Sequence, residues 1–392
     1  MLGSRSWCLL LLLVGCSSPD KRPGNGDGAG AQSSAGTGGN AGVLATATGG
    51  SAVGGSSGLG GSLGGSGGTS SSGAGGMPGG TGGTQASEAG TGGELSSEGD
   101  GDFTISAPFT DDPENAYQSG NPHGALHDFN LSSTESAIFP TDITNGQTFG
   151  RNVSVYVPAQ YVTGTEAPFM VIQDGITFYR DVMVPVLDNM IHDGRLPVMI
   201  AIFVEPGPNG GTPNGERSFE YDSVSEDYVD FVETELLPKI ETDYDLTLTT
   251  NPDGRAAMGG SSGGAAAFTM GWFRPDLYRR ILTYSGSFCD LQPNEAYPLG
   301  AWEYHDSLIP AADAKPLRVA LEVGENDGDW NTADDQHRNW RDANERMAAA
   351  LGAKGYHYRF VYALGAVHVD QGVLKQTLVE TLEWLWRGYP IQ

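Results

Sequence analysis

The sequence predicts an α/β domain with a mainly parallel β-sheet and helices on both faces. Two observations carry this prediction. Strand-like runs and helical patterns alternate along the chain from about residue 168 onward, as in proteins whose parallel strands are joined by helices. Several strand-like runs, notably Val198–Val204, are apolar without alternation, which is typical of parallel strands that are covered on both faces.

The first residues predict export. Residues 1–16, MLGSRSWCLLLLLVGC, combine a basic residue at Arg5 with a short apolar core and a small residue before Cys16. That core is too short to cross a membrane as a mature helix. The ending LVGC resembles the lipobox of bacterial lipoproteins, which implies a lipid on Cys16, a location outside the cytoplasm, and membrane contact through that anchor alone. The alternative is an ordinary secretory signal that is cut elsewhere.

Composition divides the rest of the chain into two parts. Residues 17–102 consist mainly of Gly, Ser, Thr and Ala, with almost no aromatic or large aliphatic residue. Such a segment cannot bury enough apolar surface to offset the entropy of ordering, so we expect a disordered linker. Residues 103–392 have ordinary composition and a length that suits one α/β domain with a large core.

Charge and cysteine content narrow the possible functions. The formal net charge of the 392 residues is -27, which argues against nucleic-acid binding because phosphate contacts need clustered Lys and Arg. Removal of Cys8 and acylation of Cys16 would leave Cys289 alone in the mature body, so we expect no intramolecular disulfide. We expect Cys289 to be a small buried hydrophobic residue rather than a nucleophile.

The domain contains seven strand-like runs, which end at or near polar loops: Asn152–Pro158, Phe169–Gly175, Val198–Pro206, Arg255–Ser261, Ile281–Ser287, Arg318–Asp327 and Tyr358–Leu364. Ser223 and Glu226 have the spacing of a capping box and predict the start of a helix. Near the end of the chain, a helical stripe of leucines predicts the last helix: Leu374, Leu378, Leu382 and Leu385.

The string GGSSG occurs twice, at Gly54–Gly58 and at Gly259–Gly263. Only the second copy has a strand-like run before it and a helix-competent segment after it, which is the context of a nucleophile elbow; the alternative is a structural Gly-rich turn. Gly-x-Ser-x-Gly fits both Ser261 and Ser262, and the two glycines that follow favour Ser261 as the nucleophile. Ser262 would then supply a backbone N–H to the oxyanion hole.

An acid and a base should follow the serine in the chain. His368 is the histidine that comes after a late strand and a small-residue loop and before the last helix, so we predict that it is the base. The acid is expected after the preceding strand, where Asp327 is placed best and Glu325 and Asp329 are alternatives. The run that starts at Asp327 also imitates a calcium loop, but Thr332 and Arg338 stand where that loop has glycine and glutamate.

The second oxyanion donor usually follows an early strand. In MVIQDGITFYRD, Gly175 permits close backbone approach and the N–H of Ile176 is the predicted donor. Asp174 lies before the elbow, so we expect it to hold this loop rather than to act as the triad acid. Arg217, Glu220 and Asp222 in GERSFEYD lie either near the site or in structural ion pairs.

From about residue 112 to 390 the chain resembles the esterase group of α/β-hydrolases, which includes enterochelin-esterase-like proteins, feruloyl esterases and S-formylglutathione hydrolases. The resemblance runs through SVYVPAQY, VIQDG, RSFEYDS, GGSSGG, GEND and the His368 loop. It implies that Ser261 is the nucleophile, Asp327 the acid and His368 the base. Members often have a serine directly after the histidine, where this chain has Val369, so the polarity of that loop differs.

These residues predict a serine esterase that acts on a small-molecule or glycan-linked ester through an acyl-enzyme. Nucleophilic catalysis of this kind needs no metal and no organic cofactor. Two alternatives stay open at this point. One is an acyltransferase on the same scaffold, and the other is a surface-displayed binding protein without catalytic activity.

Overall fold

The computed structural model describes residues 98–208, 215–328 and 336–391. The predicted signal sequence with Cys16, the linker up to residue 97, and Asp329 lie outside the described residues. No helix in the described ranges is both long and apolar enough to span a membrane.

The centre of the domain is a nine-stranded sheet in the order β1-β11-β10-β9-β8-β5-β6-β3-β2. The strands from β1 to β6 in this order run parallel, while β3 and β2 are antiparallel to their neighbours at one edge. The strands of this sheet are β1 (Gly101–Ser106), β2 (Ala125–Ser132), β3 (Gly150–Val157), β5 (Phe169–Gln173), β6 (Ile200–Val204), β8 (Arg255–Gly260), β9 (Arg280–Tyr284), β10 (Arg318–Asn326) and β11 (His357–Val367). The short strands β4 (Glu166–Ala167) and β7 (Thr247–Leu248) form a second, parallel pair.

Helices connect most of these strands. They are α1 (Gly175–Phe178), α2 (Arg180–His192), α3 (Glu216–Asp222), α4 (Asp227–Phe231), α5 (Leu237–Tyr244), α6 (Ser262–Phe273), α7 (Ile309–Ala311), α8 (Trp340–Ala353) and α9 (Gln371–Trp386). Short helical turns are η1 (Pro113–Asn115), η2 (Ser133–Glu135), η3 (Val232–Leu236), η4 (Pro252–Gly254), η5 (Gly300–Trp302) and η6 (Tyr304–Leu308). The mainly parallel sheet with helices on both faces is the predicted fold class.

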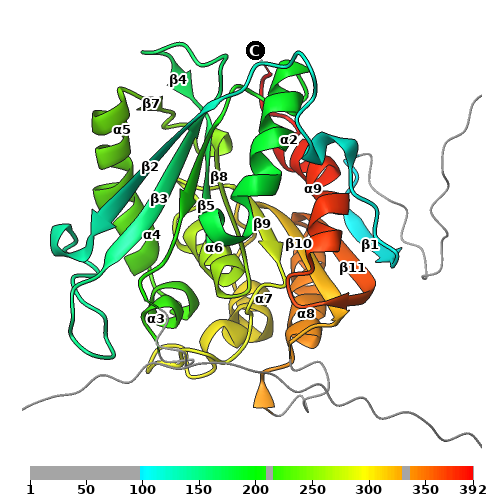
Figure 1. Cartoon of the computed structure of the whole chain (residues 1–392). Helices are drawn as coiled ribbons and strands as arrows, with labels where there is room; N and C mark the ends of the chain where they lie inside the picture. Colours follow the sequence, from blue (N-terminus) through cyan, green and yellow to red (C-terminus); the bar gives the residue numbers. More distant parts are fainter. Residues whose placement is uncertain (1–97, 209–214, 329–335, 392) are drawn as a thin grey trace, which may run out of the picture. The chain divides into compact units, whose positions relative to one another are not determined.

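Two hydrophobic cores lie on the two faces of the sheet. Consecutive residues of β5 alternate between them: Phe169 and Val171 pack in one core, and Met170 and Ile172 pack in the other. This alternation follows from the period of two in a strand, and it explains why the central strands are apolar at every position. Helices α2 and α9 cover one face side by side, whereas α4, α6 and α8 cover the other (Figure 1). Cys289 is fully buried in the core that contains Phe169 and Val171, as predicted.

The sequence did not predict the two strands at the edges of the sheet. β1 pairs in parallel with β11 and its residues alternate between half-buried and exposed, and β2 is similarly exposed along most of its length. Edge strands bury one face at most, so their sequences contain few apolar residues by which a strand could be predicted. Because β1 begins at Gly101, the predicted linker boundary at residue 102 falls inside this strand.

The predicted capping box at Ser223 is wrong. Ser223 follows the last residue of α3, and its hydroxyl donates back to the carbonyl of Phe219 at 2.5 Å; the N-cap position of the next helix is Glu226, not Ser223. Helix α4 begins at Asp227 instead and continues through the η3 turn into α5. The periodic apolar residues that predicted this helix are buried as expected: Val229, Val232 and Leu236.

Glu216, the first residue of α3, is a buried carboxyl whose titration should affect stability. Burial and, to a smaller extent, the neighbouring carboxylate of Glu220 raise its pKa from 4.5 to about 7. When a carboxyl has a higher pKa in the folded state than in the unfolded state, the free energy of unfolding falls as the pH rises from the unfolded-state pKa to the folded-state pKa. Glu216 therefore lowers the stability of the fold progressively between about pH 4.5 and pH 7, and the loss is complete above about pH 7.

We predict that Glu216→Gln raises the melting temperature relative to the wild type at pH 8. The difference should shrink as the pH falls and disappear below about pH 4.5, where Glu216 is protonated in both states. Thermal unfolding followed by circular dichroism between pH 4 and 8 measures this, with the exposed Glu226→Gln as the control. A stabilisation that does not change with pH would contradict the prediction.

Candidate active site

The second GGSSG forms a tight turn between β8 and α6. Ser261 stands at the turn with φ 54° and ψ -129°, a conformation that L-residues rarely adopt. The turn depends on glycine because a Cβ on Gly259 would lie 2.4 Å from the backbone of Gly263. This is the strained strand–turn–helix arrangement that the sequence predicted, with the Ser261 side chain in the wall of a pocket.

The neighbouring serine, Ser262, is buried in the protein. Ser262 begins α6, is 5% exposed, and accepts a hydrogen bond from Nη1 of Arg217 at 2.9 Å. Its hydroxyl does not line the pocket that Ser261 lines. Of the two serines that fit Gly-x-Ser-x-Gly, the geometry therefore favours Ser261 as the serine of the elbow.

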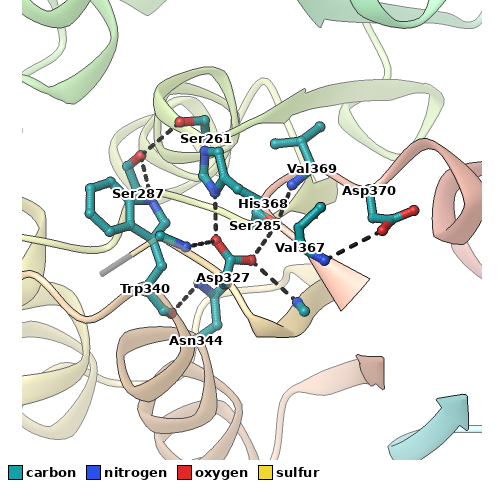
Figure 2. A network of polar contacts seen from close by, with 12 residues as sticks. Ser261, Ser285, Ser287, Asp327, Trp340, Asn344, Val367, His368, Val369 and Asp370 are labelled. Atoms are coloured by element: carbon teal, nitrogen blue, oxygen red, sulfur yellow. Dashed lines mark hydrogen bonds and ion pairs between the residues drawn. The ribbon is translucent and has the colours of Figure 1, made fainter. Parts of the chain in front are cut away.

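His368 lies on the loop after β11, and its Nδ1 is 2.5 Å from Oδ1 of Asp327 (Figure 2). Asp327 follows β10 and is 1% exposed. The backbone N–H groups of Gly324 and Gly328 donate to its two oxygens at 3.2 and 2.6 Å. Burial by itself would raise the pKa of Asp327, but the hydrogen bond and charge of His368 outweigh burial, so the pKa lies below 3.8. Asp327 is therefore an ionised orienting partner for the imidazole.

The other acidic residues have different partners. Glu325 accepts the backbone N–H of Gly365 at 2.8 Å on the surface. Asp174 is bound by Arg217, as expected for a residue that holds its loop. Asp329, with most of the calcium-like run, lies outside the described residues. Within the described ranges, no cluster of three or more His, Cys, Asp and Glu side chains could hold a metal ion.

Two serines that the sequence analysis missed complete the polar network. Ser285 follows β9; its hydroxyl donates to Oδ2 of Asp327 at 2.6 Å and accepts the N–H of Val369 at 2.9 Å. It thus connects the acid to the loop that carries His368. A signal was present in the run YSGS, because small polar residues at the carboxyl end of a central strand lie at the catalytic edge of a parallel sheet.

Ser287 is the second of these serines and is fully buried. Its oxygen lies 3.3 Å from Oγ of Ser261 and accepts the indole N–H of Trp340 at 3.0 Å (Figure 2). The Trp340 ring also packs edge-on against the His368 imidazole, with centroids 5.8 Å apart. Nothing local to Trp340 in the sequence points to this role, because its position depends on how α8 packs.

Ser261 and His368 line a pocket of about 570 Å³, within the size range of small-molecule sites. Its wall includes the charged residues Asp174, Glu205 and Arg217. Arg217 donates through Nε and Nη2 to the two oxygens of Asp174 at 2.9 and 2.7 Å. Arg217 is therefore a residue of the site.

The other two residues of GERSFEYD have structural partners. Glu220 forms a buried ion pair with Arg151, with contacts of 2.5 and 2.9 Å. Asp222 accepts the hydroxyl of Ser218 at 2.6 Å in the same helix. The sequence left the roles of these residues open; in the structure Glu220 pairs with Arg151, and Asp222 lies close enough to Arg217 for their charges to interact.

The loop after β5 carries the predicted oxyanion donor. Ile176 lies in α1, where its backbone N–H and that of Thr177 stabilise the carboxylate of Glu205. The sequence analysis did not single out Glu205, which follows β6. An oxyanion at Ile176 would share this donor with Glu205, so the role of Ile176 stays a prediction.

A serine at a strained strand–helix turn, a histidine–aspartate pair beside it and a mainly parallel sheet together define an α/β-hydrolase. Residues 148–385 match the family described as "Putative esterase". The chain belongs to this esterase family. No match was found among curated proteins.

Solved structures support the fold. Enterochelin esterase from Shigella flexneri shares 20% identity with a TM-score of 0.52, and the match covers 72% of this chain and 62% of that one. A ferulic acid esterase from Anaeromyces mucronatus, solved in complex with ferulic acid, shares 14% identity with a TM-score of 0.53 over 71% of this chain and 96% of that one. The chain spans about three fifths of the length of the enterobactin and enterochelin esterases that it matches.

Proposed function

We propose that this protein is a serine esterase that hydrolyses carboxylic esters through an acyl-enzyme intermediate. The observation that carries the proposal is the placement of Ser261 on a strained elbow in a pocket wall, with a histidine beside it that a buried aspartate orients. In Figure 2 the imidazole of His368 lies between the side chains of Ser261 and Asp327. Membership of the esterase family and the fold of the neighbours support the same reaction.

In this mechanism Oγ of Ser261 attacks the ester carbonyl while Nε2 of His368 takes its proton. Asp327 bonds to Nδ1, which fixes the tautomer that leaves Nε2 as the acceptor, and it stabilises the imidazolium that forms. The imidazolium then protonates the departing alcohol. Water, deprotonated by the same histidine, releases the acid and restores Ser261.

The tetrahedral intermediate needs hydrogen-bond donors for its oxyanion. Ser262 is the first residue of α6, where backbone N–H groups have no acceptor within the helix. We assign its N–H as one donor and that of Ile176 as the other. One such donor lowers the barrier by about 3 to 4 kcal/mol.

We also propose that the enzyme is a lipoprotein held at a membrane of the cell envelope through Cys16. The support is the lipobox-like LVGC and the Gly/Ser-rich composition of residues 17–97, both properties of the sequence. The substrate is then a small-molecule or glycan-linked ester outside the cytoplasm.

We predict that Ser261→Ala abolishes covalent labelling by a fluorophosphonate and lowers ester turnover by about four orders of magnitude or more, because the triad acts as a unit. Ser262→Ala is the matched control. It should be labelled and keep most activity, since only its backbone N–H takes part. Labelling that persists in Ser261→Ala would contradict the proposed nucleophile, and absence of labelling in the wild type would favour a non-catalytic protein.

We predict that Asp327→Asn lowers kcat by up to about 10⁴-fold, because the imidazole would be held in the wrong tautomer. Glu325→Gln removes a nearby carboxylate whose partner is a backbone N–H on the surface, so it should have little effect. Both variants should be compared for kcat on an aryl ester. Equal losses in the two variants would contradict the assignment of Asp327.

The contact between Ser287 and Ser261 generates another prediction. Because Trp340 donates to Ser287, the proton of Ser287 can point to Oγ of Ser261. The proton of Ser261 is then free for transfer to His368 in the proposed mechanism. A neutral hydrogen bond of this kind contributes about 1 kcal/mol, so Ser287→Ala should lower kcat roughly fivefold and leave KM unchanged.

Trp340→Phe keeps the ring and removes the indole N–H, so it tests the same chain of hydrogen bonds. The double variant should lose little more than the worse single variant, because both changes break one chain. Fully additive losses in kcat would show that Ser287 and Trp340 act independently.

A further inference from the structure

The pocket beside Ser261 is lined by the cation Arg217, three of whose five N–H groups are bonded within the protein. Nε and Nη2 of Arg217 bind the Asp174 carboxylate, and Nη1 donates to the hydroxyl of Ser262 at 2.9 Å. The charges of Arg217 and Asp174 compensate each other at 2.7 Å. A negatively charged substrate group that approaches this guanidinium would therefore also meet the charge of Asp174.

The remaining carboxylate of the pocket, Glu205, has neutral hydrogen-bond partners. The backbone N–H of Thr177 donates to Oε1 at 2.8 Å and the Thr177 hydroxyl donates to Oε2 at 3.1 Å. Burial raises the pKa of Glu205 and the like charge of Asp174 adds to this effect, while the Thr177 donors oppose it. With His368 neutral in its role as base, no cation among the described residues that line the pocket compensates the carboxylate of Glu205.

An ionised carboxylate has about four lone-pair sites, and the two Thr177 donors and the backbone N–H of Ile176 take up to three of them. A remaining site can accept a hydroxyl or an ammonium group of a ligand. An anionic group would be repelled, and more strongly than in bulk water because the pocket partly excludes solvent.

We propose that Glu205 determines substrate charge: the pocket takes esters with uncharged, hydroxyl-bearing or cationic groups and rejects esters with a carboxylate, sulfate or phosphate close to the scissile bond. This inference rests on the proposed esterase function and adds the substrate class to it.

Two series of aryl esters test the inference, because the pocket can receive the acyl or the alcohol part. The first series contains phenyl esters of 4-methylbenzoate, 4-carboxybenzoate and 4-(aminomethyl)benzoate. The second contains acetates of the phenols with the same three substituents. The members of each series have similar shapes and differ in charge, and the charged group cannot reach the ester of its own molecule. Values of kcat/KM at pH 8 are measured for the wild type and for Glu205→Gln.

In at least one series the wild type should favour the neutral ester over the anionic one by roughly tenfold or more, and Glu205→Gln should narrow that ratio by about tenfold. Glu205→Asp keeps the charge and should keep the preference. Glu226→Gln removes one exposed carboxylate outside the pocket and should leave the ratio unchanged, which separates a local effect from the net charge of -27.

Ratios that are the same in Glu205→Gln and the wild type in both series would overturn the inference. The proposed function is tested separately by Ser261-dependent hydrolysis of the neutral esters. If no ester is hydrolysed, the inference is tested by binding: NMR titration with 4-methylbenzamide and 4-methylbenzoate should show that Glu205→Gln gains affinity for the anion alone. Equal changes for both ligands would overturn it.

Discussion

The close approach of β8 and α6 is the constraint on which the rest of the site depends. A Cβ on Gly259 would meet the backbone of Gly263, and a Cβ on Gly263 would lie 2.9 Å from Oδ2 of Asp174. Because glycines occupy positions 259 and 263, β8, α6 and the loop after β5 can pack this closely. This contact forces Ser261 into a left-handed conformation and directs its side chain into the pocket. Every other functional group is placed relative to that side chain.

The acid–base pair depends on the same edge of the sheet. Parallel strands end side by side, so residues that are far apart in the chain come together after β8, β9, β10 and β11. Ser285 shows how tightly these ends are joined, because its one hydroxyl bonds to both Asp327 and the loop of His368. An aspartate with this many donors stays ionised although it is buried, and an ionised aspartate is what the proposed mechanism requires.

The sequence predicted what depends on local pattern. The glycines and serines around Ser261 indicate a turn by their own stereochemistry, and the apolar runs of β5 and β6 indicate buried parallel strands. Ser287 and Trp340 could not be predicted in this way, because their contact joins β9 to α8 and depends on tertiary packing. The capping box at Ser223 failed because α4 begins at Asp227, with Glu226 and not Ser223 at its N-cap position.

Backbone strain shows how the fold supports this chemistry. Among the described residues, the non-glycine residues with positive φ include Asp174, Ser261, Ser285 and Val369, which all lie at the site. Such conformations cost about 1 to 3 kcal/mol each and persist where surrounding contacts determine them. Each of the four is tied to another part of the network, for example Asp174 by the bidentate contact with Arg217. Since Arg217 also holds Ser262, one guanidinium in the pocket wall links the loop of one proposed oxyanion donor to the helix of the other. The distance between the two donors is thus fixed before any substrate arrives, which is the preorganisation that electrostatic stabilisation of an oxyanion requires.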